Sequence, residues 1–397
     1  MCEQGKVRSL YLRLCAVCVF RSVLKLPLFR SFLAYAAEEG GMDKKLLAYS
    51  SFVSKIYMGG GNLADCVRRA VFENENVYVT SLAKGHQCDA QIAASLEREL
   101  ATLAEFAALT PADFAKDMAC DLPVAGFHSE KIDLSAEYAA RVRQIGKYGY
   151  GMFAAYGMFR LSDGANPVLE PIRTPDKISL DSFIGYAEER GRVLANTEAF
   201  LEGRSAANVL LYGDAGTGKS STVKAVANHF FDRGLRLIEL RKDQLSLLPY
   251  VMGQIGENPL KFIIFIDDLS FHRSDDCFSM LKAALEGSAA AKAPNAVIYA
   301  TSNRRHIVRE TFSERDGSEV HRNDSMQEAL SLSERFGMTI LFARPNQKLY
   351  LEIVREMAAK KGVTLPTAEL ETRAEAFALG RGTRSARCAE QFIESLL

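Results

Sequence analysis

A glycine-rich segment in the second half of the chain has the residue spacing of a phosphate-binding loop. Residues 213–220 read Gly-Asp-Ala-Gly-Thr-Gly-Lys-Ser, which fits the pattern G-x-x-x-x-G-K-[ST]. Glycines let backbone N–H groups surround phosphate oxygens, beside a helix N-terminus whose dipole favours anions. We therefore predict that Lys219 supplies a cation to the β- and γ-phosphates of a nucleotide and that Ser220 offers its hydroxyl to Mg²⁺. The other predicted loop contacts are Gly213, Asp214, Ala215, Gly216, Thr217, Gly218 and Ser221.

Two adjacent carboxylates follow an apolar run further along the chain. The residues Phe262–Ile266 lead directly into Asp267 and Asp268. A phosphate loop needs a metal-positioning acid at the end of a neighbouring strand, so we assign Asp267 to Mg²⁺. We predict that Asp268 orients or deprotonates the attacking water. The structural alternative is that the two acids only cap the turn after the strand.

Polar and cationic residues in three later segments complete the candidate site. Asn303 follows the apolar run 296–300, and at the carboxyl end of a central strand it can hold the γ-phosphate or the lytic water. Arg335 lies in the segment Ser-Glu-Arg-Phe-Gly and is predicted to stabilise transition-state charge on the nucleotide of an adjoining subunit. Arg384 and Arg387 begin the last helical segment. A lone arginine is by default a surface ion pair, so the order and spacing of these sites carry the prediction.

The segments that must position these residues alternate between short apolar runs and helical patterns. Residues 220–232 form one amphipathic pattern, which Gly234 ends, and from Asn346 onward the pattern is purely helical. Apolar strands alternating with helices predict an α/β fold with a parallel sheet covered on both faces. The predicted strands are Val209–Tyr212, Leu235–Leu240, Phe262–Ile266, Ala296–Ala300 and Met338–Phe342.

The first 165 residues are helical in pattern and carry no chemical motif. Residues 89–109 place apolar side chains on one stripe, and Thr110 reads as the N-cap of the next helix. The glycine- and aromatic-rich segment 146–159 favours a packed hinge or core segment over a docking surface, and prolines in 162–177 predict a linker. We expect a mainly helical domain at 1–165, a nucleotide-binding core at 166–345 and a helical lid at 346–397.

Composition excludes several classes of protein. The chain has 397 residues, 48% hydrophobic and 25% charged, so it is neither disordered nor of low complexity. With 49 basic and 49 acidic residues, it is not a general nucleic-acid coat. The first 31 residues carry six Lys/Arg and one Glu, yet a packing helix with solvated charges is favoured there over a lipid- or nucleic-acid-binding helix.

Two further expectations concern location. No segment has the length of apolar sequence that a membrane-spanning helix needs, so we expect no membrane insertion. The chain has 8 cysteines, mostly isolated, which fits reduced thiols in the cytoplasm. Cys15 and Cys18 lack a second ligand pair and are predicted to be core thiols rather than zinc ligands.

These motifs together resemble the AAA+ superfamily of P-loop ATPases. The chain is similar to them in a Walker A (GDAGTGKS), a Walker B (FIIFIDD), a sensor 1 (YATSN), an arginine-finger segment (SERFG) and a sensor 2 helix. The segment LDSFIGY looks like the one that flanks adenine, which implies nucleotide contacts for Gly185 and Tyr186. Over residues 167–397 the motifs more narrowly resemble a bacterial family of predicted AAA+-type ATPases known as a domain of unknown function. Residues 1–165 are poorly covered.

The resemblance implies ATP and Mg²⁺ as cofactors, ATP-dependent assembly of like subunits, and remodelling or loading of a DNA or protein client. A nucleotide-gated scaffold with little turnover is the alternative. Two departures from the common pattern matter. Walker B ends in Asp-Asp instead of Asp-Glu, as in helicase loaders and replication initiators, which implies slow hydrolysis. Either Arg384 or Arg387 fits sensor 2, and Ser-Ala-Arg before an apolar helix favours Arg387.

Overall fold

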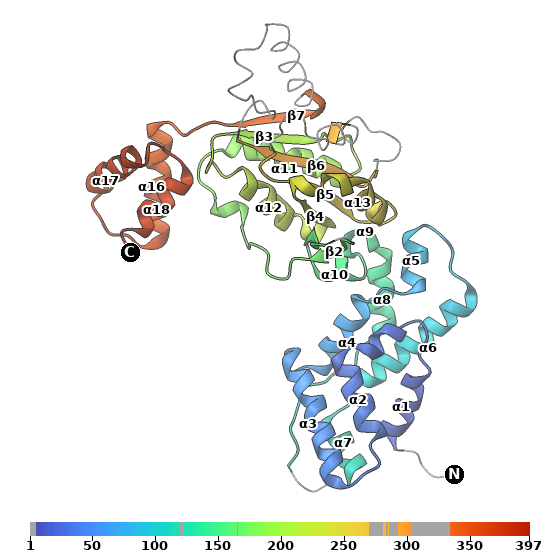
Figure 1. The fold of residues 1–397 in the computed structure, drawn as a ribbon. Helices are drawn as coiled ribbons and strands as arrows, with labels where there is room; N and C mark the ends of the chain where they lie inside the picture. The colour runs from blue at the N-terminus through green and yellow to red at the C-terminus, as the bar shows by residue number, and fades with distance from the viewer. Residues whose placement is uncertain are drawn as a thin grey trace. The chain divides into compact units, whose positions relative to one another are not determined.

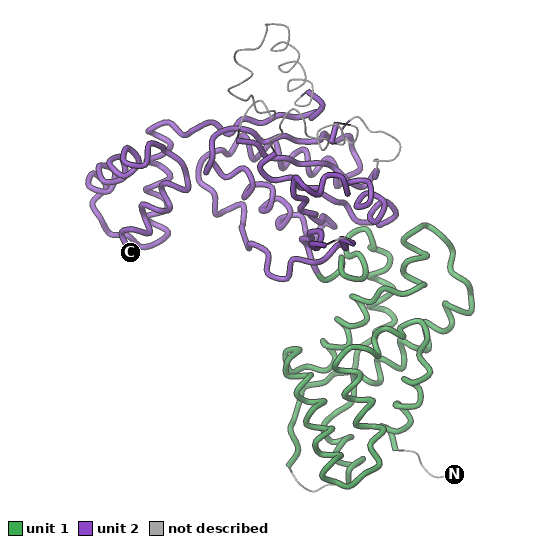
Figure 2. Tube along the Cα trace, viewed as in Figure 1, with its two compact units in different colours: residues 1–155 green, residues 156–397 purple. Residues whose placement is uncertain are grey.

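The computed structural model describes residues 5–119, 123–164, 166–269, 281–282, 285, 293–303 and 334–397. The chain divides into two compact units, Met1–Ala155 and Tyr156–Leu397 (Figures 1 and 2). This division precedes the expected boundary at residue 165. No helix among the described residues is long and apolar enough to cross a membrane.

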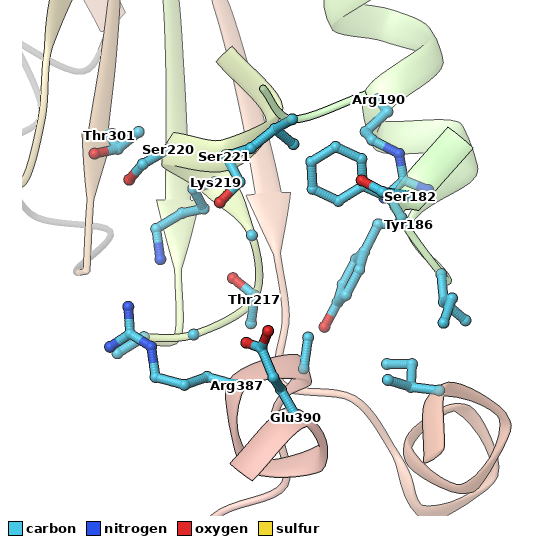
Figure 3. A pocket seen from close by; sticks show the side chains of 18 of the residues that line it. Ser182, Tyr186, Arg190, Thr217, Lys219, Ser220, Ser221, Thr301, Arg387 and Glu390 are labelled. Carbon is cyan, nitrogen blue, oxygen red and sulfur yellow. The ribbon is translucent and has the colours of Figure 1, made fainter. Parts of the chain in front are cut away.

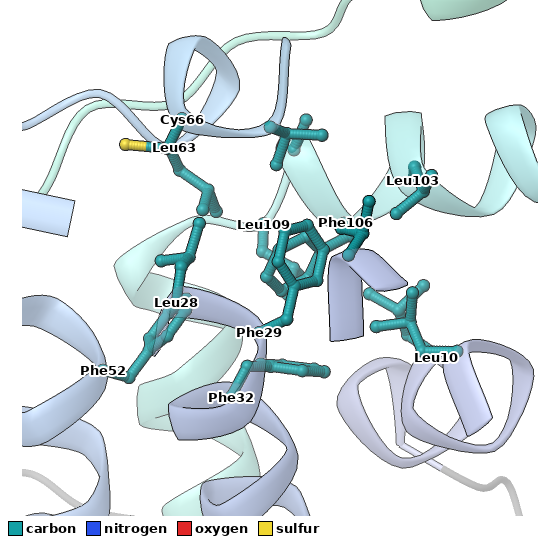
Figure 4. Packing of buried hydrophobic residues seen from close by; sticks show 14 of the residues in the cluster. Leu10, Leu28, Phe29, Phe32, Phe52, Leu63, Cys66, Leu103, Phe106 and Leu109 are labelled. Atoms are coloured by element: carbon teal, nitrogen blue, oxygen red, sulfur yellow. The ribbon is translucent and has the colours of Figure 1, made fainter. Parts of the chain in front are cut away.

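The first unit is built of helices around an aromatic core. Phe32 packs against Phe52, Phe106 and Phe114, with ring centroids 4.7 to 6.3 Å apart. Figure 4 shows Phe32, Phe52 and Phe106 in this core. The predicted stripe holds, because Leu96, Leu100, Leu103 and Phe106 are buried. The helices are α1 (Lys6–Cys15), η1 (Arg21–Lys25, a 3-10 helix), α2 (Pro27–Ala37), α3 (Met42–Met58), α4 (Leu63–Phe72), α5 (Val77–Ala83), α6 (Ala90–Ala107), α7 (Pro111–Met118), α8 (Leu134–Arg143), α9 (Ile145–Tyr148) and α10 (Met152–Ala155).

Side-chain caps fix several of these helices. Thr110 accepts a hydrogen bond from the backbone N–H of Asp113, and Asp113 accepts one from that of Thr110, so the predicted cap forms a full capping box. The prediction of core thiols for the first cysteine pair is wrong, since Cys15 and Cys18 are both exposed. They lie where α1 ends, and the apolar stripe of that helix faces the core through Val7, Leu10 and Leu14 instead.

The second unit contains a seven-stranded sheet in the order β2-β1-β4-β5-β6-β3-β7. All neighbouring strands are parallel except β1 and β2. The five predicted strands are confirmed, and with them the α/β class with a mostly parallel sheet. The strands are β1 (Met158–Leu161), β2 (Leu169–Pro171), β3 (Val209–Gly213), β4 (Leu235–Leu240), β5 (Lys261–Ile266), β6 (Ala296–Ser302) and β7 (Met338–Phe342).

Strands β1 and β2 occupy sequence that was expected to be helical domain and linker. Met158, Phe159 and Leu161 are buried in β1, which pairs with β4 and extends the sheet at that edge. Pro171 is tolerated because β2 is the edge strand. The four residues of β1 adjoin a Gly-rich segment and carry too little alternation to be distinguished from a hinge. The domain boundary expected at residue 165 therefore lies later than the division after Ala155.

Helices and lid complete the second unit. Helices α11 (Ala187–Leu201) and α12 (Lys219–His229) share one apolar cluster with alternate residues of the central strands, such as Leu211, Ile263 and Phe265. Residues 262–266 of β5 are all fully buried, as expected for a strand covered on both faces. Short helices η2 (Leu180–Ser182), η3 (Phe231–Arg233), η4 (Lys242–Leu247) and α13 (Leu248–Ile255) fill the connections. The C-terminal segment predicted to form a lid comprises α16 (Gln347–Lys361), α17 (Thr367–Arg381) and α18 (Ala386–Glu394).

Candidate functional site

The loop between β3 and α12 has the shape its glycines predict. Gly216 and Gly218 have φ of 76° and 89°, a left-handed region that other residues rarely adopt. Gly213 has φ of 135°, and a Cβ there would collide with the backbone of Phe342 in β7. Thr217 Oγ1 donates to the carbonyl of Asp214 at 2.9 Å, which closes the loop. The backbone is thus bent around a space directly before the N-terminus of α12.

Lys219 is buried at the mouth of this loop. Its Nζ donates to the carbonyls of Gly213 and Asp214, at 3.0 and 2.7 Å, and to Asn303 Oδ1 at 3.1 Å. Burial lowers the pKa of Lys219 below its ordinary value, while the nearby Asp214, Asp268 and Asp267 oppose that shift. The ammonium is therefore held by neutral oxygens and partly desolvated, which strengthens its attraction to an incoming anion.

The strand ends of β5 and β6 bring the metal-binding candidates to Ser220. The Ser220 hydroxyl donates to Asp267 Oδ1 at 2.6 Å, and the Thr301 hydroxyl donates to the same oxygen. Thr301 Oγ1 also accepts the backbone N–H of Asp268 at 2.9 Å. A hydroxyl and a carboxylate at contact distance are hard oxygen donors of the kind Mg²⁺ prefers.

Asp268 adopts an unusual backbone conformation beside Asn303. Its φ is 50°, one of three positive values at non-glycine residues among the described ones. Asn303 Nδ2 donates to Asp268 Oδ1 at 2.8 Å, so the Asn303 amide links Lys219 to Asp268. A non-glycine residue in this region costs about 1–3 kcal/mol, and such strain concentrates at functional sites.

These residues line one pocket of about 570 Å³ (Figure 3). Its apolar end is formed by Phe183, Ile184 and Tyr186 before α11 and by Ile353 and Met357 of the lid helix α16. This end provides flat apolar contacts of the kind that a purine base needs.

The aromatic residues at this end are firmly fixed. The Tyr186 hydroxyl donates to the carbonyl of Ala343 at 2.6 Å, and burial raises the pKa of Tyr186 to about 12. The guanidinium of Arg190 lies 4.9 Å from the centre of the Phe183 ring and donates to the carbonyl of Gly185. Burial lowers the pKa of Arg190.

The two lid arginines lie in different environments. Arg387 lines the pocket, its backbone N–H donates to the carbonyl of Gly216 at 3.4 Å, and its side chain lies in the same part of the pocket as Lys219 (Figure 3). Arg384 is not among the lining residues, because its guanidinium pairs with Glu375 of α17 at 2.7 Å. That ion pair raises the pKa of Arg384.

The structure brings together most of the predicted site residues, and others lie just outside the pocket. Gly213, Asp214 and Gly185 are not among its lining residues. Asp214 instead accepts the backbone N–H of Arg344 at 3.1 Å, and the Arg344 side chain donates to the carbonyl of Gly382 in the lid. Arg335 is half-buried in helical backbone shortly before β7 and does not line the pocket of its own chain. The predicted residues that line it are Tyr186, Ala215, Gly216, Thr217, Gly218, Lys219, Ser220, Ser221, Asp267, Asp268, Asn303 and Arg387.

Sequence reasoning missed four kinds of lining residue. Thr301 stands inside the quoted sensor 1 motif, so its position two residues before Asn303 was the available signal. Arg190 follows Tyr186 by one helical turn, and Glu390 follows Arg387 by about one turn. The apolar Ile353 and Met357 gave no signal, because they look like ordinary lid core.

Comparisons with known proteins locate the chain in a family. No curated protein matches it. Among solved structures, it is similar to the RuvB Holliday junction branch migration motor of Thermotoga maritima, with 16% identity and a TM-score of 0.34, covering 55% of this chain and 72% of that one. A DNA replication initiation factor gives 18% identity and a TM-score of 0.37, covering 56% of this chain and 64% of that one. The model of one family matches residues 154–397, so the chain belongs to the family described as "Protein of unknown function (DUF815)", as the motifs predicted.

Proposed function

We propose that the chain is a Mg²⁺-dependent ATPase of the AAA+ type that couples ATP binding and hydrolysis to movement between the core and the helical lid. The observation that carries this proposal is the hydrogen-bonded chain from Lys219 through Asn303 to Asp268, beside the Ser220–Asp267 contact, in one pocket. A cation, a polar positioning group, a candidate base and a metal-binding pair are the parts that phosphoryl transfer to water requires.

The residues present fit both ATP and Mg²⁺. The Lys219 ammonium is held by weak neutral acceptors, which phosphate oxygens can replace with stronger charge-assisted hydrogen bonds. Among the described residues no group of three or more His, Cys, Asp or Glu could hold a metal, so Ser220 and Asp267 would complete the Mg²⁺ shell with phosphate oxygens and water. Bound there, Mg²⁺ would neutralise charge on the phosphates.

The chain's own residues supply the remaining chemistry. Asp268 would accept a proton from water as the water oxygen attacks the γ-phosphorus and the bond to the bridging oxygen of ADP breaks. Asn303 now binds Asp268, and by exchanging that partner for the γ-phosphate it would report the nucleotide state to the base. The lid would sense the same state through Arg387, whose backbone already contacts Gly216.

ATP turnover by the purified protein tests the proposal. We expect Lys219→Ala to lose both nucleotide binding and turnover. Asp268→Asn keeps the shape and the Asn303 contact, so it should bind ATP but hydrolyse it about 10²–10⁴-fold more slowly. Equal turnover in wild type and Asp268→Asn would remove Asp268 from its role.

One observation favours a second candidate, a nucleotide-gated scaffold with little turnover. Asp268 accepts a hydrogen bond from Asn303 and has a strained backbone. Its side chain is one methylene shorter than that of a glutamate, so the carboxylate reaches less far toward an attacking water. ATP binding that depends on Lys219, without detectable turnover in the wild type, would favour this candidate.

We also propose that Arg335 acts on the nucleotide of a neighbouring subunit. Its position outside its own pocket supports this role. Arg335→Ala and Lys219→Ala should each be inactive alone, and mixing them should restore part of the turnover if the arginine acts between subunits. A protein that stays monomeric by light scattering with an ATP analogue, together with normal hydrolysis by Arg335→Ala, would contradict the proposal.

A further inference from the structure

A second cavity, of about 500 Å³, lies in the first unit and has no part in the nucleotide site. It is formed where α1 ends, by the 3-10 helix η1 and by α2. Its lining residues are Cys15, Arg21, Leu24, Lys25, Arg30 and Leu33, which we call the basic cavity.

The charged side chains that line the basic cavity are all cationic. The lining contains Arg21, Lys25 and Arg30 and no carboxylate. The Arg21 guanidinium donates to the carbonyl of Cys15 at 3.0 Å, and neither the Lys25 side chain nor the Arg30 side chain has an ion pair or a hydrogen bond with any described residue.

Two cations of the preceding helix α1, by contrast, have acidic partners. Lys6 pairs with Asp113 at 2.9 Å, and Arg13 pairs with Glu105. The N-terminal basic residues therefore fall into two groups. Those of the first group form ion pairs that join α1 to neighbouring helices, and those of the second group have no acidic partner among the described residues and line the basic cavity. A concave surface lined by one sign of charge focuses its field and concentrates counter-ions.

The cavity is also preorganised. Glu99 of α6 is 7% exposed and accepts the backbone N–H groups of Cys18, Val19 and Phe20. Three hydrogen bonds to one carboxylate fix the loop between α1 and η1. A ligand would thus pay little ordering entropy in the backbone that carries Arg21 and Lys25.

We propose that the basic cavity binds the phosphate backbone of a nucleic acid. Arg21 and Lys25 stand four residues apart in a 3-10 helix, about 8 Å along its axis, which is about two of the 3.4 Å repeats at which one strand places its phosphates. Arg30 lines the same cavity from α2. Leu24 is 9% exposed and Leu33 half-buried, so the concavity offers little apolar surface to a flat bilayer.

The first experiment measures binding of the full-length protein, without ATP, to a fluorescein-labelled 20-nucleotide single strand and its duplex by anisotropy. Binding without ATP keeps this result separate from the fate of the proposed ATPase. Three phosphate contacts predict a slope of log K against log salt of about −2 to −3, or about a 40-fold loss of affinity from 50 to 200 mM salt for the duplex.

Substitutions locate the binding. The variant carrying Arg21→Gln, Lys25→Gln and Arg30→Gln should bind at least tenfold more weakly at low salt and lose most of the slope. The matched control carries Arg98→Gln, Lys116→Gln and Lys131→Gln, which removes the same charge from exposed positions outside the cavity and should bind as the wild type does. Equal affinities for wild type and cavity variant, or equal losses in the two variants, would overturn the proposal.

Cys15 provides a readout inside the cavity that does not depend on charge substitution. Iodoacetamide labelling, followed by peptide mapping, should be slowed severalfold at Cys15 by saturating nucleic acid and left unchanged at the half-buried Cys88, which does not line the cavity. An unchanged rate at Cys15 would overturn the proposal. So would equal protection by millimolar inorganic phosphate, or sedimentation with vesicles containing anionic lipid when nucleic acid does not bind.

Discussion

The phosphate loop and the basic cavity are two anion-attracting regions built in opposite ways. In the loop a single buried lysine is held by backbone carbonyls, next to glycines whose backbone angles other residues rarely adopt. In the cavity three exposed side chains act from a helical surface. Function in the first region should therefore depend on every part at once, whereas contributions in the second should nearly add.

The largest expected effect tests the backbone of the loop. Gly213→Ala places a Cβ against the carbonyl of Phe342, so β3 and β7 must shift and ATP affinity should fall at least about 100-fold. Gly203→Ala is the matched control, because Gly203 also has positive φ but no atom lies near its Cβ position. The control should cost only about 1 kcal/mol of stability. Similar nucleotide titrations for both variants would show that the loop tolerates displacement.

The next prediction compares the two arginines near the start of α18, Arg384 and Arg387. Arg387→Ala removes a cation from the pocket and should lower ATP affinity about tenfold, the equivalent of one charge-assisted hydrogen bond. Arg384→Ala unpairs Glu375 in the lid and should change affinity by at most about twofold. Isothermal titration with a non-hydrolysable analogue distinguishes them, and a larger loss for Arg384→Ala would reverse the sensor 2 assignment.

A smaller effect concerns pH. Burial lowers the pKa of Lys219 below 10.5, so the free protein loses this proton at a lower pH than an ordinary lysine does. Because phosphates need the ammonium, ATP affinity should fall about fivefold as pH rises through that lowered pKa. Lys219→Arg stays charged and should not show this fall, although its overall affinity is lower. Parallel pH profiles for the two proteins would contradict the prediction.

The smallest expected effect is in the basic cavity. Lys25→Ala should weaken nucleic-acid binding only about threefold and reduce the salt slope by about 1, because the two arginines remain. Anisotropy titrations at several salt concentrations measure both quantities. A complete loss of binding from this single change would show that the cavity, like the loop, depends on one residue.

The features that could be predicted from the sequence have a local pattern, and those that could not depend on contacts between distant elements. The loop, Asp267, Asp268, Asn303 and the five apolar strands were predictable, because glycine geometry and strand burial leave local patterns. Ile353 and Met357 were not, since their roles depend on which elements meet across the pocket. The exposure of Cys15 and the pairing of Arg13 with Glu105 are tertiary facts that no spacing along the chain encodes.

The connection from β7 to the lid is tied at two points to the nucleotide site. Ala343 accepts a hydrogen bond from Tyr186 at the base end of the pocket, and the next residue, Arg344, donates to Asp214 of the phosphate loop. The residues at which the proposed lid would pivot are therefore hydrogen-bonded to Tyr186 in the pocket wall and to the loop that precedes α12. Helix α16 has 15 residues and extends about 22 Å from that pivot. A rotation of about 5° at the pivot would move the far end of α16 by about 2 Å. A small rearrangement around a bound nucleotide would thus become a displacement that changes the contacts of a bound partner.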